Sequence, residues 1–140
     1  MFKRIMLAFD NSLNAQKAVQ MGYELAKTHN CEMHVVAVIH LPDYAGTIDE
    51  VDDVVKEGKK FYTEAINAVV AEGVKQGIEM HSKILYGHIG NTLIKYAKEN
   101  GVDLIITGAH GRSPIGKLLL GSVSDYVVKH SGCPVLIVKG

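Results

Sequence analysis

The sequence predicts an α/β protein with a doubly wound, Rossmann-like parallel sheet of five strands and helices on both faces. Three observations favour this class. Short apolar runs alternate with longer amphipathic stretches along the chain, which gives five strands and four helices. The run at 35–39 is continuously apolar, as expected for a parallel strand covered on both faces. A glycine-rich segment near the C-terminus follows a strand and precedes a helix, which is where such folds hold phosphates.

The first half of the chain begins with an apolar strand at 5–9, which ends at Asp10. Asn11 and Ser12 supply the turn and the cap of a helix that extends to about His29. The second strand covers residues 32–39.

A polar and acidic stretch follows at 41–53, where we expect a loop or a frayed helix start. Beyond it, apolar residues recur at helical spacing up to Gln76, and Gly77 ends this helix. The apolar residues of this stripe are Val54, Phe61, Ala65, Val69 and Val70.

The second half of the chain repeats the alternation of strands and helices. Residues 78–85 alternate between apolar and polar, as in an outer strand, and a helix covers 90–100. The fourth strand covers 102–107, the last helix 121–130, and the fifth strand 135–138.

Length and composition fit a single domain over residues 1–140. The chain is 47% hydrophobic and 21% charged, so it has enough apolar side chains for a full core. Lys plus Arg equals Asp plus Glu at 15 each, so neither a nucleic acid nor a membrane is expected as partner. No apolar run reaches 18 residues and no signal peptide is recognisable, so we predict a cytoplasmic protein.

The two cysteines fit a reducing compartment, because Cys31 and Cys133 lie far apart and match no Cys-x-x-Cys spacing. The spacing of His29, Cys31 and His34 suggests a metal site at first sight. Cys31 begins a strand, however, and alternate residues of a strand face opposite ways, so we favour structural packing there.

The glycine-rich segment reads Gly108-x-x-Gly111, nine further residues, and then Gly121-Ser122-Val123-Ser124. Glycine lets the backbone approach a phosphate closely, and the following helix start offers free N–H groups and the positive end of its dipole. Ser122 with Asp125 matches a capping box, which places the helix start there. The alternative is that the glycines form an ordinary turn and Ser122 only caps the helix.

Charged residues near this segment are further candidates. Arg112 would contact a phosphate, although an exposed Arg in a loop is more often simply solvated. Asp10 closes the first strand, and if that strand lies beside the fourth, its carboxylate hydrogen-bonds a ribose or a base in the same crevice. The alternative for Asp10 is a helix cap.

These residues carry a resemblance to a known family. The spacing Gly-x2-Gly-x9-Gly-(Ser/Thr) is complete as Gly108, Gly111, Gly121 and Ser122. The start of the chain through Asp10 and its end, Cys-Pro-Val-Leu-Ile-Val-Lys, support the same match. Over its whole length the chain resembles the universal stress protein family, with its UspA-like domain, in the nucleotide-binding subclass.

The resemblance implies that ATP is bound, with or without Mg²⁺ or Mn²⁺ on the phosphates. Ala8, Phe9 and Asp10 would border the adenine and ribose, and the backbone of Val38 would meet the adenine edge. The residues that would wrap the phosphates are Gly108, Gly111, Gly121, Ser122, Val123 and Ser124. Asn11 and Ile89 depart from the glycine and proline that relatives often have at these positions.

The resemblance also implies the strand order 3-2-1-4-5 and a homodimer through the last strand. A physical argument agrees, because Val135–Val138 then lies on an edge, and an open apolar edge strand invites aggregation. A loop that covers this edge is the alternative.

The expected function is an ATP-binding module of the stress response, with at most slow ATP hydrolysis or autophosphorylation on Ser122 or Ser124. No catalytic residue is predicted, because no base near the terminal phosphate is evident. Two alternatives stay open. One is a nucleotide-using enzyme of the adenine nucleotide alpha hydrolase-like superfamily, which would adenylate, transfer a phosphoryl group or slowly hydrolyse ATP. The other is a ligand-free dimeric scaffold.

Overall fold

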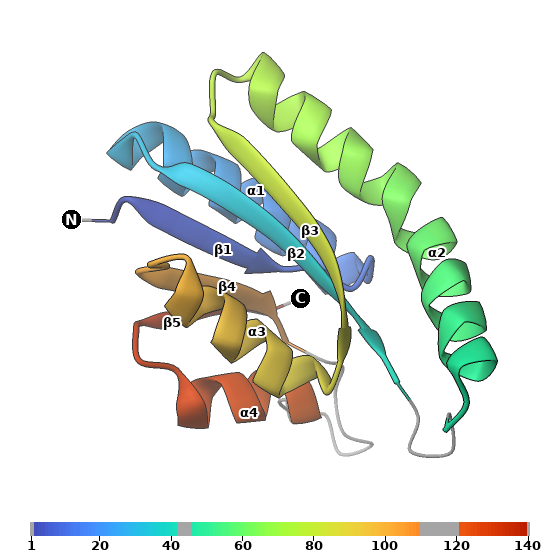
Figure 1. The fold of residues 1–140 in the computed structure, drawn as a ribbon. Coiled ribbons are helices and arrows are strands. Elements are labelled where there is room, and N and C mark those ends of the chain that lie inside the picture. The colour runs from blue at the N-terminus through green and yellow to red at the C-terminus, as the bar shows by residue number, and fades with distance from the viewer. Residues whose placement is uncertain (1, 42–45, 110–120, 140) are drawn as a thin grey trace, which may run out of the picture.

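The computed structural model describes residues 2–41, 46–109 and 121–139, and it confirms the predicted sheet. Five parallel strands lie in the order β3-β2-β1-β4-β5 (Figure 1). The strands are β1 (Arg4–Ala8), β2 (Glu32–His40), β3 (Met80–Gly87), β4 (Leu104–Gly108) and β5 (Val135–Val138). The helices between them are α1 (Leu13–His29), α2 (Ile48–Lys75), α3 (Ile89–Glu99) and α4 (Ser122–His130).

The strand order reverses at β1, which lies in the middle of the sheet. From β1 the chain moves outward to β2 and β3, and it then returns to the other side of β1 for β4 and β5. Ala8 at the end of β1 lies opposite Val36 on β2 and Thr107 on β4. The carboxyl ends of β1 and β4 therefore meet at the switch point, where open α/β sheets bind their ligands.

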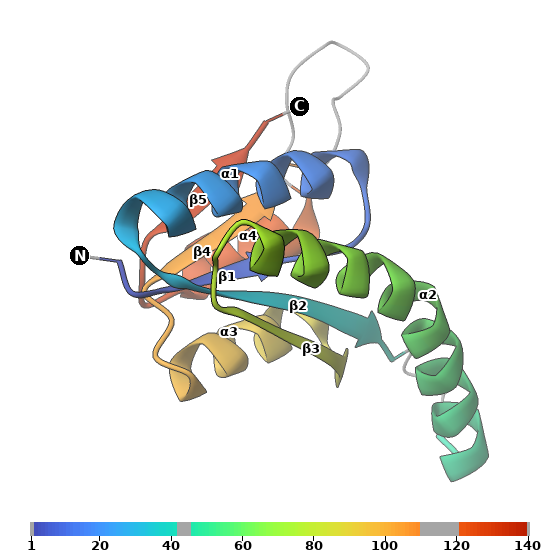
Figure 2. The same ribbon diagram turned by 90° about the horizontal axis from the view of Figure 1, so that it is seen from above.

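Two hydrophobic clusters, one on each face, hold the sheet between its helices. On one face α1 and α2 pack over Leu7, Val35 and Ile106, and on the other α3 and α4 pack over Met6 and Ile105 (Figure 2). All five of these strand residues are fully buried, which explains the continuous apolar runs in the sequence. Within the described ranges, no helix combines the length and apolarity needed to span a bilayer.

Helix α2 begins earlier than its apolar pattern predicted. It starts at Ile48 rather than near Val54, because Thr47 caps it by accepting a hydrogen bond from the Glu50 amide at 3.1 Å. Asp49 and Glu50 in the first turn favour the positive end of the helix dipole. The acidic residues that suggested a loop are therefore part of the helix start.

The buried face of α2 also differs from the predicted stripe. Phe61 points outward and is 61% exposed, whereas Ile66, Val69 and Gly73 are buried and Tyr62 is half-buried. These four inward residues follow one another at intervals of four, three and four, which is the period of a helix face. The prediction for Phe61 was wrong because a large apolar side chain was counted without testing this register.

Candidate functional site

A pocket with a volume of about 180 Å³ opens at the carboxyl ends of β1 and β4. It collects the predicted site residues that the structure describes, from four separate parts of the chain. These residues are Ala8, Phe9, Asp10, Val38, Gly108, Gly121, Ser122, Val123 and Ser124. The other two, Gly111 and Arg112, lie outside the described residues.

The turn after β1 orients Asp10 at one side of this pocket. The Asp10 carboxylate accepts a hydrogen bond from the Ser12 amide at 3.0 Å, and the Ser12 hydroxyl caps α1 by accepting from the Ala15 amide at 3.1 Å. The cap of α1 is therefore Ser12, as predicted, and not Asp10. Asn11 between them has a φ of 61°, a left-handed conformation that glycine and asparagine tolerate best. Asp10 stays exposed to solvent.

The start of α4 also lines the pocket, and no side chain of the described residues caps it. Gly121 is the N-cap residue and Ser122 is already the first helical residue, so the predicted capping box of Ser122 and Asp125 is wrong. Asp125 instead pairs with Lys129 one turn later, at 3.0 Å. The helix begins one residue before the position that the capping pattern predicted, and this shift carries the serine out of capping geometry.

Among the described residues, the first-turn amides of α4 have no hydrogen-bond acceptor. The Asp125 amide bonds to the Gly121 carbonyl at 2.9 Å, and no helical carbonyl lies upstream for the amides of Ser122, Val123 and Ser124. These amides and the helix dipole together favour an anion at this point. The site can therefore bind a negatively charged group close to the end of β4.

Gly108 and Ser124 fix the first turn of α4 against β4. The buried Ser124 hydroxyl donates a hydrogen bond to the Gly108 carbonyl at 3.2 Å. A Cβ atom at Gly108 would lie 2.8 Å from the backbone carbonyl carbon of Asn14, so α1 packs too closely there for any side chain. The Asn14 amide group also donates to the Ala109 carbonyl. Close packing on α1 is thus a sufficient reason for glycine at position 108.

Sequence reasoning missed five residues that line the pocket, of which Tyr62 and Thr107 carry hydroxyl groups. The missed residues are Val36, Tyr62, Ile89, Leu93 and Thr107. Burial, with the Asp10 carboxylate nearby, raises the pKa of Tyr62 and keeps its hydroxyl protonated. The interval of four residues between Tyr62 and the buried Ile66 was a signal that could have found it.

The described lining of the pocket carries few ionisable groups. Asp10 is the one carboxylate among its described lining residues, and the remaining polar groups there are hydroxyls and backbone amides. The fold and this pocket together define a doubly wound α/β protein with a ligand pocket at its switch point.

Comparison with known proteins gives the family. A model of the universal stress protein family matches residues 1–139, so the chain belongs to that family. A universal stress protein of Thermus aquaticus is 33% identical, with 99% of this chain and 100% of that protein covered. The universal stress protein YxiE of Bacillus subtilis is 30% identical, again over 99% of this chain and 100% of the relative.

Solved structures support the same conclusion. The universal stress protein UspA from Lactobacillus plantarum superposes with a TM-score of 0.82 at 25% identity, covering 98% of this chain and 97% of its own. A universal stress protein in complex with cAMP has a TM-score of 0.70 at 24% identity, with coverage of 98% and 97%. One from Archaeoglobus fulgidus in complex with dAMP has a TM-score of 0.65 at 20% identity, with coverage of 99% and 98%. The last two likenesses show the fold alone.

Proposed function

We propose that this chain is a regulatory module of the stress response that binds ATP in the pocket between Asp10 and the start of α4. The observation that carries the proposal is that two unlike binding groups line one pocket. One is a carboxylate suited to ribose or base hydroxyls and amines, and the other is the set of first-turn amides of α4, which suit phosphates. Membership of the universal stress protein family supports it.

The size of the pocket suggests how the nucleotide lies. A cavity of about 180 Å³ is smaller than the roughly 300–1,000 Å³ of sites that enclose whole ligands. We therefore assign the enclosed part to the adenine and ribose, beside Ala8, Phe9 and the backbone of Val38. The phosphates extend along Gly121 and the first turn of α4, and a Mg²⁺ or Mn²⁺ ion would accompany them there. Gly111 and Arg112 belong to the same proposed phosphate site.

Two structural neighbours favour an adenine nucleotide over other anions. Their ligands, cAMP and dAMP, share the adenine base and a phosphate with ATP. The extra phosphates of ATP would gain further contacts with free amides at the helix start, each worth about 1.5–3 kcal/mol as a charge-assisted hydrogen bond. Three such contacts are consistent with micromolar affinity after the cost of association.

The proposal includes a homodimer that joins the β5 strands of two copies. β5 pairs only with β4 in the described sheet, so its other edge has free backbone groups. Its four residues, Val135–Val138, are all apolar and only half-buried. We also predict a cytoplasmic location, in keeping with the two free thiols of Cys31 and Cys133.

The first experiment identifies any nucleotide that the protein carries. Freshly purified protein is denatured, and the released compounds are identified by chromatography and mass spectrometry before any ligand is added. Stripped protein is then titrated calorimetrically with ATP, AMP and adenosine. We expect adenine nucleotide in the released fraction and micromolar binding of ATP. A protein that carries none and binds none of the three would contradict the proposal and favour the ligand-free scaffold.

A substitution tests the ribose side of the pocket. Asp10→Ala should weaken ATP and adenosine alike, by about tenfold or more, because both lose the same hydrogen bond to a charged group. Asp49→Ala removes an equally exposed carboxylate from the start of α2 and serves as the matched control. If Asp10→Ala binds both ligands as the parent does, the assignment of Asp10 is wrong.

A further inference from the structure

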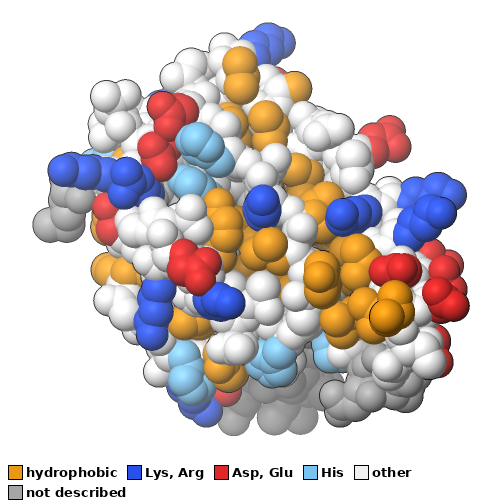
Figure 3. Space-filling model, in the orientation of Figure 1, with side chains coloured by type: hydrophobic (Ala, Val, Ile, Leu, Met, Phe, Trp, Pro, Cys, Tyr) orange, Lys and Arg blue, Asp and Glu red, His pale blue; other side chains and the backbone are white. Residues whose placement is uncertain are grey.

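A second pocket lies at the opposite end of the strands from the first, near the amino ends of β1, β2 and β3. It has a volume of about 530 Å³ and shares no described lining residue with the pocket of the proposed nucleotide site. Figure 3 shows histidine and acidic side chains side by side on this face of the molecule. The side chains that matter for the inference are Glu32, His34, His81 and Tyr96, which all line this pocket.

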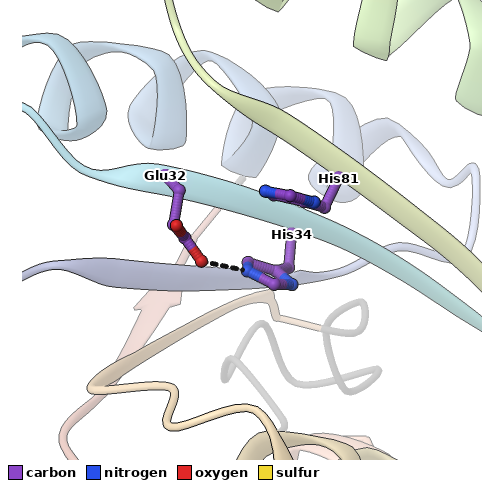
Figure 4. A group of neighbouring side chains, drawn as sticks. All are labelled: Glu32, His34 and His81. Carbon is purple, nitrogen blue, oxygen red and sulfur yellow. Dashed lines mark hydrogen bonds and ion pairs between the residues drawn. The ribbon is translucent and has the colours of Figure 1, made fainter.

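The parallel register of β2 and β3 brings three ligand-type side chains together. His34 lies directly opposite His81, and Glu32 is two residues before His34, so all three project from the same face of the sheet. One ligand atom from each lies within 4.8 Å of the other two. Figure 4 shows Glu32 and His34 on β2 with the His81 ring beside them on β3. We propose that Glu32, His34 and His81 form a binding site for a zinc ion.

The donor set agrees with this metal. Two imidazole nitrogens and one carboxylate oxygen are a usual zinc set, in which the fourth tetrahedral position is held by water or another ligand. Bond lengths of about 2.0–2.2 Å place such ligand atoms roughly 3.3 Å apart. The His34 and His81 rings now stack at 4.7 Å between centroids. The His81 side chain is 46% exposed, so it has room to rotate toward the other two ligands, as the proposal requires.

His34 is already held in the orientation that a metal ligand needs. Its ring is buried, with Nδ1 2.7 Å from the Tyr96 hydroxyl and Nε2 2.9 Å from Glu32 Oε1. A metal on Nε2 requires the proton of the neutral ring to be on Nδ1, where the Tyr96 oxygen accepts it. Such a partner on the second nitrogen fixes the ring and its tautomer in metal sites.

The charged side chains around Glu32, His34 and His81 affect whether a cation can bind there. Arg4 contacts the cluster, with its Nε 3.0 Å from Glu32 Oε1, and its side chain is half exposed. Glu79 adds a second carboxylate, 2.9 Å from His81 Nε2, so the two histidines lie among two carboxylates and one guanidinium. On zinc binding the Arg4 side chain is free to turn toward solvent, and Glu79 can hold His81 as Tyr96 holds His34.

Calorimetric titration of the full, metal-free chain with zinc chloride tests the proposal, with no nucleotide present. We expect one zinc ion per chain with micromolar or tighter affinity for the parent. His81→Gln should weaken that affinity at least tenfold, and because the side chain is exposed, the variant should fold as the parent does. His130→Gln on α4 removes another exposed histidine and should bind zinc as the parent does. ATP affinity should stay unchanged in His81→Gln, because the two pockets share no described residue.

Nuclear magnetic resonance of the imidazole nitrogens identifies the residues directly. Zinc should shift the His34 Nε2 resonance and one nitrogen of His81, and Tyr96→Phe should weaken binding less than His81→Gln does. Equal zinc affinity of the parent and His81→Gln would overturn the proposal, as would nitrogen shifts confined to other histidines. The absence of zinc binding by the parent at micromolar concentration would overturn it as well.

Discussion

At the level of single residues, the Tyr23 hydroxyl joins the two helices on one face of the sheet. It is buried on α1 and donates a hydrogen bond of 2.6 Å to the Val69 carbonyl on α2. Burial, with Glu72 nearby, raises the pKa of Tyr23 from 10.0 to about 12. Because the folded pKa is raised, the stabilising effect of this group is complete below about pH 10 and is lost as the pH rises to about 12.

Tyr23→Phe should therefore have two effects. At neutral pH it should lower the free energy of unfolding by about 1 kcal/mol, because a neutral hydrogen bond is lost. Between about pH 10 and about pH 12 the stability of the variant should fall less steeply than that of the parent. Urea unfolding at several pH values measures both effects, with Tyr86→Phe, at an exposed position, as control. Parallel curves for the parent and Tyr23→Phe would show that Tyr23 has an ordinary pKa.

Single-residue roles were predicted from sequence where backbone chemistry determines them. Ser12 was predicted as the cap of α1 from its type and position, and the structure agrees. Tyr62 was missed because its place in the pocket depends on the packing of α2 against the sheet, which local sequence does not encode. The neighbours of His34 were missed for a related reason, since the pairing with His81 depends on the register of β2 and β3.

At the level of elements, a negative charge at the start of α4 should have opposite effects on helix stability and on phosphate binding. Ser122→Glu places a carboxylate in the first turn, where the helix dipole favours it by about 0.3–1 kcal/mol. The same charge should repel phosphates, so ATP affinity should fall about tenfold while adenosine affinity stays unchanged. Calorimetry and thermal unfolding measure these outcomes, and Ser122→Gln is the control of equal size without charge. If Ser122→Glu binds ATP as Ser122→Gln does, the phosphates lie elsewhere.

The contact between α1 and β4 makes a second prediction at this level. A Cβ atom at Gly108 would lie 2.8 Å from backbone atoms of Asn14, whereas one at Gly132 would meet nothing within 4 Å. Gly108→Ala should therefore lower the free energy of unfolding by about 1–3 kcal/mol, as overpacking does. Gly132→Ala should stay within about 0.5 kcal/mol of the parent. Equal stability of the two variants in urea would mean that α1 yields at this contact.

Element boundaries were predicted well where glycine or an apolar run marks them. Gly77, with a φ of 83°, follows α2 as predicted, and β5 has the predicted bounds. The two helix starts at Ile48 and Ser122 differ from prediction because caps compete. Thr47 was available as a cap ahead of the acidic residues, and Gly121 replaced the serine at the N-cap position of α4. Which of several adjacent polar residues caps a helix depends on the backbone conformation of the residues that precede the helix.

At the level of the whole molecule, the alternation of strands and helices predicted the sheet, and family resemblance supplied its order. Parallel strands with right-handed crossovers leave few arrangements, and the buried runs of β1, β2 and β4 identify the inner strands. The two pockets lie at opposite ends of the strands, one at the carboxyl ends and one at the amino ends. The first was predicted because glycine motifs mark it. The second was not, because the sequence pattern around His34 favoured packing and did not indicate His81.

The position of β5 at the edge of the sheet leads to a prediction about the proposed homodimer. Val135, Leu136 and Val138 pack against the two core clusters, whereas Ile137 belongs to neither cluster among the described residues. Lysine on an edge strand blocks pairing with another strand, because its charge would have to be buried. Ile137→Lys should therefore leave the fold intact and shift the protein from dimer to monomer.

Analytical ultracentrifugation over a range of concentrations measures this change. The parent should sediment as a dimer, and Ile137→Lys should raise the dimer dissociation constant at least tenfold. Val128→Lys, at an exposed position on α4, adds the same charge away from the edge and should remain dimeric. A monomeric parent would refute the dimer itself, and an Ile137→Lys variant that stays dimeric would move the interface to another surface. If monomeric Ile137→Lys still binds ATP, the proposed nucleotide site is complete within one chain and does not need residues of the second copy.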